Sequence, residues 1–460
     1  MTHYTIQTTV APAGTLKVYM DSDLAGLTVP THQTIMFPND LIERIDVVGG
    51  VMDVEQIDLD FVEDYTNYAE GFWHKLLQRT TTQIQLTLDE GSGETHLFFG
   101  IVQQGATPLT EISLTAGAIQ RQGTMHVLSF LAQLKLVTLQ SVIDACFASG
   151  LIYFIPSHID GTVNTLGEYV RLQSFIDEAI VLATGQSYTS TDVTILSSDI
   201  KLKSNSDSSY VDLQHIAIYQ ADLYPLTARY TYAWDFILTM CLDLGLVPRW
   251  KYDVGRAHHQ IDLLTRGTSY AGNVTLSMPK ESTLIEGTPQ LINYIELDYG
   301  GDTEKYYYDV SNAIGYDTEP NGWQADMIIP IEVGNYRVSA PYACITLWAM
   351  IGGDVWSTIG IEYWNYFTGA WVNTDGGDSL IRQDHALAWY YAARLGAIKR
   401  VYERTYTDLK ANDGSTNSHV NISLLRNTQI DYGTGPLTFY ATEVHKNLPK
   451  NELFVRWQQV

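Results

Sequence analysis

The spacing of hydrophobic and polar residues changes along this chain between two periods. Near the start the period is two, as in "ERIDVVGGVMDVEQIDLDF" and in "TQIQLTLDE" and "THLFFGIVQQ", which "GSGE" joins. Successive side chains of a strand point to opposite faces of a sheet, so this period predicts strands and a hairpin. Between them, "NYAEGFWHKLLQRT" has apolar residues at helical spacing and predicts a short helix over 67–80.

From Val127 the period becomes that of a helix. The stretches "LSFLAQLKLVTLQSVIDACFASG" and "EYVRLQSFIDEAIVLATG" predict helices that end at Gly150 and Gly185, because glycine readily adopts the left-handed conformation at helix ends. The segment 231–266 gives the clearest pattern. Its apolar helical face includes Phe236 and Met240, and "RWKYDV" and "HQIDLLTR" follow, which predicts a helix, a turn and a hairpin.

Strand patterns return beyond residue 277, and one helix is predicted from Ala386 to Thr405. The chain closes with "TFYATEVH" and "LFVRWQQ", a predicted hairpin in which we expect Phe454 in the core. The segment 95–119 has the same order of features: an aromatic-rich strand, a bend with proline, and a strand that begins at an acidic residue. We interpret the two segments as parts of two related β-domains, although two hairpins can also be alike by chance.

The formal net charge of −25 narrows the classes of partner. Binding of duplex DNA needs cations that displace its counterions, so an acidic surface of this kind repels nucleic acid. Such a charge is ordinary for a soluble protein, and it also suits a surface along which nucleic acid slides without sticking. The start of the chain has no pattern of a signal peptide, and its apolar runs are too short to cross a bilayer, so no membrane insertion is expected.

The order of these features resembles the hub proteins of phage tail tips and baseplates and of related contractile injection machines. The features that match are "LFFGIVQQ…EISLTA", the segment 231–266, the predicted helix Ala386–Thr405 and the terminal "FYATEVHKNLPKNELFVRWQQ". The resemblance implies an α+β, mostly β fold, with two tube-type β-barrel domains at 1–126 and 278–460. A mixed α/β insertion with a helix–turn–hairpin unit would occupy 127–277.

The same resemblance implies a function and a set of partners. It implies a homotrimer ring with pseudo-sixfold symmetry that joins the hexameric tail tube, or a distal tail protein, to the trimeric tip or fibre proteins. DNA would only pass through its channel, and the protein would be assembled in the host cytoplasm and located in the virion. A distal tail protein, which forms a hexameric ring, is the related alternative.

An aromatic segment suggests a different class of function. In "GIEYWNYFTGAWVNTDGGD", Tyr363, Trp364, Tyr366 and Trp371 are candidates either for a subunit interface or for stacking on sugar rings. A carbohydrate-binding or glycan-degrading tail protein is therefore a second hypothesis. The "FTGAW" turn favours a hairpin whose aromatics fill a core or an interface.

The remaining candidate groups point to no enzyme, cofactor or metal site. The acidic stretch "DVEQIDLDFVED" places Asp58 and Asp60 on one face of a strand and Ile57, Leu59 and Phe61 on the other, which is typical of a solvated face behind a core face. The adjacent His258 and His259 are expected to be polar residues of a surface loop. Cysteines are expected as buried thiols rather than disulfides at three positions: Cys146, Cys241 and Cys344.

Overall fold

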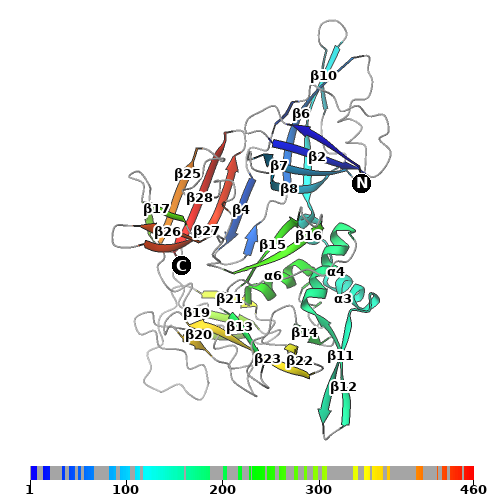
Figure 1. The fold of residues 1–460 in the computed structure, drawn as a ribbon, viewed down its shortest axis with the longest axis vertical. Helices are drawn as coiled ribbons and strands as arrows, with labels where there is room; N and C mark the ends of the chain where they lie inside the picture. The colour runs from blue at the N-terminus through cyan, green and yellow to red at the C-terminus, as the bar shows by residue number, and fades with distance from the viewer. Residues whose placement is uncertain are drawn as a thin grey trace.

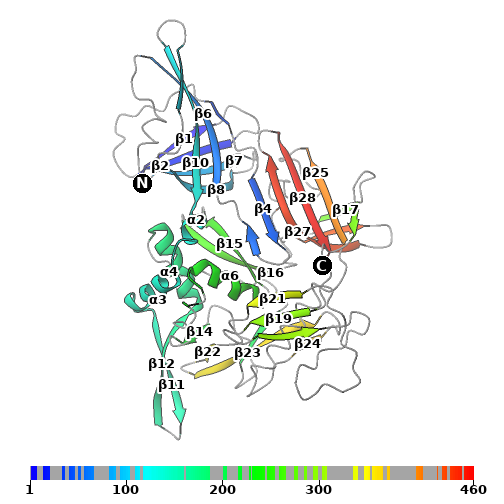
Figure 2. The same ribbon diagram turned by 180° about the vertical axis from the view of Figure 1, so that it is seen from behind.

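Strands make up most of the fold, and short helices lie near its centre (Figure 1 and Figure 2). This computed structural model describes residues 2–7, 14–20, 34–36, 41–46, 50–52, 56–66, 82–89, 94–103, 109–113, 118–159, 162–186, 200–204, 216–219, 227–228, 230–243, 246–253, 258–265, 274–277, 284–286, 294–298, 303–307, 335–339, 347–352, 355–365, 370–372, 400–407, 422, 427–431, 436–447 and 450–459. The predicted helix over 67–80 lies outside these residues.

The first large sheet, called here the N-terminal sheet, has eight strands within the described residues. In spatial order they are β1 (Thr2–Gln7), β2 (Gly14–Met20), β7 (Gln83–Asp89), β8 (Glu94–Val102), β10 (Ala118–Ser129), β6 (Gln56–Thr66) and β3 (Thr34–Met36), with β9 (Leu109–Ser113) also paired to β10. The predicted hairpin is confirmed, because β7 and β8 pair antiparallel and Asp89 lies opposite Glu94.

The second large sheet, called here the C-terminal sheet, also has eight strands in the described part of the chain. Its order is β17 (Val274–Ser277), β26 (Asn427–Asp431), β27 (Pro436–Asn447), β28 (Glu452–Gln459), β25 (Arg400–Tyr406) and β18 (Leu284–Glu286), with β4 (Leu41–Asp46) paired to β27 and β5 (Gly50–Met52) paired to β4. The predicted terminal hairpin is confirmed as β27 and β28.

Two further sheets lie at the other end of the molecule (Figure 1). The lower sheet contains β11 (Ile152–Ile159), β12 (Thr162–Arg171), β14 (Ile216–Tyr219), β22 (Leu347–Gly352), β23 (Val355–Asn365) and β13 (Ile200–Ser204), with β24 (Ala370–Val372) paired to β23. The small sheet consists of β20 (Thr303–Tyr307), β19 (Tyr294–Asp298) and β21 (Asn335–Ser339).

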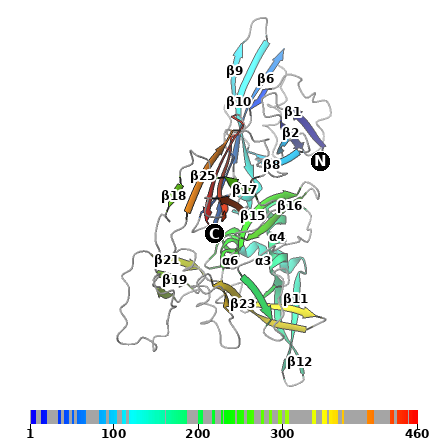
Figure 3. The same cartoon turned by 60° about the vertical axis from the view of Figure 1, so that its left-hand side comes forward.

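Helices and one hairpin join these sheets. The helices are α2 (Phe130–Leu134), α3 (Leu139–Ala148), α4 (Leu172–Thr184) and α6 (Ala233–Asp243), and the central hairpin consists of β15 (Leu246–Asp253) and β16 (His258–Thr265). The predicted helix–turn–hairpin unit is confirmed, since Phe236 and Met240 of α6 are fully buried. Strand β15 contacts both β5 and β8, so the central hairpin bridges the two large sheets (Figure 3).

Three helix predictions are wrong at their ends. The helix predicted from Glu168 begins only at Leu172, because β12 continues to Arg171. The helix predicted from Leu128 is split, because β10 continues to Ser129 and the side chains of Ser129 and Thr138 each accept a backbone hydrogen bond at the start of a new helix, α2 and α3. The helix predicted from Ala386 to Thr405 contains the strand β25 instead. Its residues Tyr402 and Tyr406 are buried beside β28. A separation of four residues puts two side chains on one face of a strand as well as of a helix, so the apolar spacing did not distinguish the two. Residues 386–399 lie outside the described part.

The strands of two sheets cross the predicted domain limits. The pair β4 and β5 lies within 1–126 in sequence, yet β4 pairs with β27 through Glu443 and Arg44. The strands β22 to β24 lie within 278–460, yet β22 pairs with β14 of the lower sheet. Pairings between residues as distant as Arg44 and Glu443, or Ile216 and Ala349, leave no local pattern in the sequence, so contiguous limits could not include them.

Candidate functional site

Three of the four candidate aromatic residues lie in the β23–β24 pair. Trp364 lies directly opposite Trp371 in the antiparallel register, and Tyr363 lies opposite Val372. Residues directly opposite each other share a face of the sheet, so the two tryptophans belong to one face. Tyr363 also pairs with Ile200 of β13, which places it between two strands inside the lower sheet. Tyr366 lies outside the described residues.

The acidic strand β6 has the two faces that the sequence predicts. Ile57, Leu59 and Phe61 are buried, whereas Asp58 and Asp60 are exposed. From β10, Thr124 donates a hydrogen bond to Asp60 Oδ1 (2.5 Å), and His126 Nδ1 lies 2.7 Å from Asp58 Oδ1.

These contacts argue against Asp58 as the general acid of a glycosidase. Partial burial raises the pKa of the Asp58 carboxyl, but hydrogen bonds from Gln56 and with His126, together with the charge of His126, lower it by more, so it lies below its ordinary value. A glycosidase needs one carboxyl whose pKa is raised, so that it stays protonated. Asp58 has the opposite property. Of the other acidic residues of this stretch, Asp53 lies outside the described residues, and Glu63 and Asp64 belong to β6.

The prediction for the adjacent histidines is wrong. His258 and His259 begin β16 rather than lie on a surface loop, and their exposed fractions are only 7% and 5%. The His259 ring lies among aromatic rings of β8, α2 and β15. The hairpin predicted from "RWKYDV" and "HQIDLLTR" already included His259, but only the tertiary packing buries both histidines. Among the described residues, no cluster of histidine, cysteine or acidic side chains has the arrangement of a metal site.

The two cysteines in the described part of the chain are buried, as predicted. Cys146 on α3 and Cys241 on α6 are inaccessible, and no disulfide joins them. Burial, together with the nearby Glu178 and Asp177, raises the pKa of the Cys146 thiol to about 12. Since the thiolate is the nucleophilic form, Cys146 is unsuited to nucleophilic catalysis. Cys344 lies outside the described residues.

The arrangement that sequence reasoning missed is a shared pattern of strand pairing in the two large sheets. Each sheet is built on a strand of 12 residues, β10 and β27. One side of β10 pairs with β6 along almost its whole length, and the other side pairs first with β9 and then with β8. One side of β27 likewise pairs with β28, and the other side pairs first with β26 and then with β4.

This pattern differs from the repeat that the sequence suggested. The terminal segment 437–460 is a hairpin, but within 95–119 the strands β8 and β9 both pair with β10 and not with each other. The pairing partners of β10 and β27 come from distant parts of the chain, so a comparison of two short stretches could not find the correspondence.

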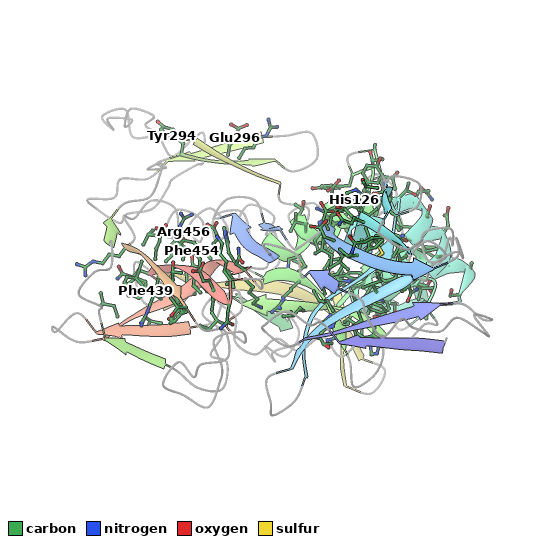
Figure 4. All side chains as sticks on the ribbon, turned by 90° about the horizontal axis from the view of Figure 1, so that it is seen from above. His126, Tyr294, Glu296, Phe439, Phe454 and Arg456 are labelled. Carbon is green, nitrogen blue, oxygen red and sulfur yellow. The ribbon has the colours of Figure 1, made fainter. Side chains whose placement is uncertain are left out.

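Both long strands carry a polar side-chain pair near the point where their partner changes. In the N-terminal sheet the pair is His126 with Asp58, and in the C-terminal sheet it is Glu443 with Arg456. Each pair joins residues that lie directly opposite each other in register. Arg456 Nη1 donates to Glu443 Oε2 (2.6 Å), and Arg456 Nε donates to Glu403 Oε1 (2.6 Å). Figure 4 shows Arg456 beside Phe454, with Phe439 apart from them.

Comparison with known proteins gives matches of low identity only. No protein-family model matches the sequence, and no curated protein is significantly similar to it. Among solved structures, the 43 kDa tail protein of prophage MuSo2 from Shewanella oneidensis has 7% identity and a TM-score of 0.40, over 93% of this chain and 97% of that one. A tail protein from Neisseria meningitidis has 8% identity and a TM-score of 0.36, over 93% and 95%.

A third match is an Escherichia coli protein described as a component of the type VI secretion system. It has 10% identity and a TM-score of 0.34, over 96% of this chain and 76% of that one. These similar structures are thus tail and secretion-system proteins. Sequence identities and TM-scores this low assign no role to any residue of this chain. None of the helices described is long and apolar enough to span a membrane.

Proposed function

We propose that this protein is a structural hub of a phage tail tip or baseplate, which forms a homotrimeric ring between a hexameric tail tube and a trimeric tip. The observation that carries the proposal is the pair of eight-stranded sheets with the same pairing pattern around β10 and β27. Three copies of a chain with two related sheets present six of them, so a trimer can match a sixfold tube on one side and a threefold tip on the other.

The edges of the N-terminal sheet support assembly through strands. Its outermost strands are β1 and β3, and each pairs with a single neighbour among the described residues. An edge strand presents backbone N–H and C=O groups that favour pairing with another chain, and closure into a ring satisfies them. We assign the partners accordingly: other copies of this chain around the ring, a tail tube or distal tail protein on one side, and tip or fibre proteins on the other.

The net charge supports a passive channel. With a charge of −25 the surface repels the DNA phosphates, so DNA would pass through the ring without being held. The protein would be assembled in the host cytoplasm and located in the virion. The proposal assigns it no catalytic activity and no cofactor. The proposal keeps the division into barrel domains at 1–126 and 278–460 and an insertion at 127–277. Strands β4, β22 and β23 pair across these limits.

The mass of the assembly in solution tests the proposal. Light scattering behind size exclusion is expected to give three times the 51.6 kDa mass of the chain, and the value should persist on dilution. A mass of six chains would favour the distal tail protein, whose hexameric ring needs only one such sheet per chain. A monomer at every concentration would count against self-assembly of the ring.

Carbohydrate binding remains a second candidate function because of one observation. Trp364 and Trp371 share a face of the β23–β24 pair, as an aromatic platform for a sugar ring requires. Titration with oligosaccharides, followed by tryptophan fluorescence, tests it with the variants Trp364→Ala and Trp371→Ala. A fluorescence change that both variants lose would support this function. No change in the natural protein, with impaired assembly in the variants, would support the structural role instead.

A further inference from the structure

One buried imidazole lies where three parts of the molecule meet. The His259 ring, on β16, stacks on Phe99 of β8 with a centroid distance of 5.1 Å and an interplanar angle of 13°. It lies 4.2 Å from the ring of Phe130 at the start of α2, and 4.9 Å and 5.3 Å from Tyr252 and Trp250 on β15. The central hairpin therefore meets the N-terminal sheet through this one side chain and its aromatic neighbours.

The backbone of the same residue is also fixed. Gln186, just after α4, donates from Nε2 to the carbonyl oxygen of His259 (3.1 Å) and accepts from its backbone N–H at Oε1 (2.9 Å). A side-chain amide that both donates to and accepts from one residue imitates the pairing of a neighbouring strand. The end of α4, the central hairpin and the N-terminal sheet thus converge at His259.

This environment disfavours a positive charge on His259. His259 is 5% exposed, and its Nδ1 has no hydrogen-bond partner among the described residues; the same is true of His258 Nε2. The titratable side chains that act on His259 are His96 of β8 and His258 of β16, and both become cations on protonation. Burial and these two histidines lower the pKa of His259 to about 3. Within the part of the chain that the structure describes, no carboxylate is among the groups that act on it.

We propose that this contact, the His259 joint, is an acid-sensitive hinge: protonation of His259 releases the central hairpin from β8 and α2 while the two large sheets stay folded. The released imidazole gains water and loses the repulsion of His96 and His258. The ring of Tyr252 on the central hairpin lies 5.6 Å from the ring of His96 on β8, and this contact would separate together with that of His259. The protein would therefore loosen between its N-terminal sheet and its central helices on acidification.

The direction of the effect follows from proton linkage. The closed joint holds the pKa of His259 at about 3, and the released ring returns towards the ordinary value of 6.5. The open form therefore binds more protons between these two values. Each unit of pH below 6.5 favours opening by about tenfold, and the effect ends near pH 3. Above pH 7 the joint does not respond to pH.

Hydrogen exchange followed by mass spectrometry, corrected for the intrinsic pH dependence of exchange, tests the hinge on the full-length protein. Between pH 7.5 and pH 4.5, protection of peptides from 246–265 is expected to fall about a hundredfold, while peptides from 437–459 keep theirs. In His259→Phe, whose ring keeps the aromatic packing, the loss should disappear. His259→Leu serves as a second variant if His259→Phe does not fold.

The control variant is His126→Gln, which removes a histidine from the surface of β10 and should retain the natural pH response. Three results would each overturn the hinge. One is unchanged protection of 246–265 in the natural protein at pH 4.5. Another is an equal loss in 437–459, which would mean general acid unfolding. The third is a pH response that persists without the His259 imidazole.

Discussion

At the residue scale, cross-strand side-chain pairs fix the polar faces of both large sheets. Arg456 is the clearest case, because its guanidinium bridges Glu403 and Glu443, and the Glu443 side chain is only 10% exposed. His445 adds a further contact, with Nε2 2.6 Å from Glu443 Oε1. A buried carboxylate is costly unless it is paired, so Arg456 is required by the residue that it neutralises.

Removal of this guanidinium should destabilise the C-terminal sheet. Arg456→Met leaves Glu443 buried without its cation, and we expect the free energy of unfolding to fall by about 1–3 kcal/mol. The matched control is Arg337→Met: the Arg337 side chain is 60% exposed and its Nε lies 3.6 Å from Glu296, so a change within about 0.5 kcal/mol is expected. Chemical denaturation followed by circular dichroism measures both. Equal losses in the two variants would contradict this role of Arg456.

A glycine of the N-terminal sheet is required by the close approach of two strands. A Cβ on Gly100 would overlap the backbone carbonyl oxygen of Leu128 on β10 and lie 2.8 Å from the Phe98 ring. The backbone cannot move aside cheaply, so Gly100→Ala is expected to cost about 1–3 kcal/mol and lower the melting temperature. Differential scanning calorimetry measures it. An unchanged melting temperature would mean that β8 and β10 are farther apart than described.

At the element scale, alternation predicted the strands better than it predicted their inward faces. The two faces of β6 were predicted correctly, because five alternating residues set the phase. In β28 the expected core residue Phe454 is only half-buried and packs its ring 5.2 Å from that of His445. The buried apolar residues of β28 are instead Leu453, Val455 and Trp457. A strand with aromatic residues on both faces does not reveal from its sequence which face is covered.

Two substitutions on β28 test this assignment of faces. Trp457 is 1% exposed and contacts the rings of Tyr402 and Tyr406, so Trp457→Ala should cost about 3–5 kcal/mol. Phe454→Ala removes a half-buried ring from the opposite face, and a loss of about 1 kcal/mol is expected. Urea unfolding of the two variants compares them directly. A larger loss for Phe454→Ala would reverse the faces of the terminal hairpin.

At the scale of the whole molecule, the sequence predicted a mostly β fold with a helical centre but not how its sheets are assembled. Strand β4 completes the C-terminal sheet from near the start of the chain, and β22 to β24 complete the lower sheet from beyond residue 346. The polar pairs of the two large sheets, His126 with Asp58 and Glu443 with Arg456, became visible only once strand register was known. Both pairs lie near the point where the long strand changes its partner.

Assembly into a trimeric ring is the central claim, and images of the assembled particle test it most directly. Negative-stain electron microscopy of the purified protein is expected to show threefold rings with six lobes of density around a central hole, one lobe for each large sheet. Rings of six chains, or compact particles without a hole at concentrations where chains associate, would contradict the claim that two related sheets in each chain convert threefold symmetry into sixfold.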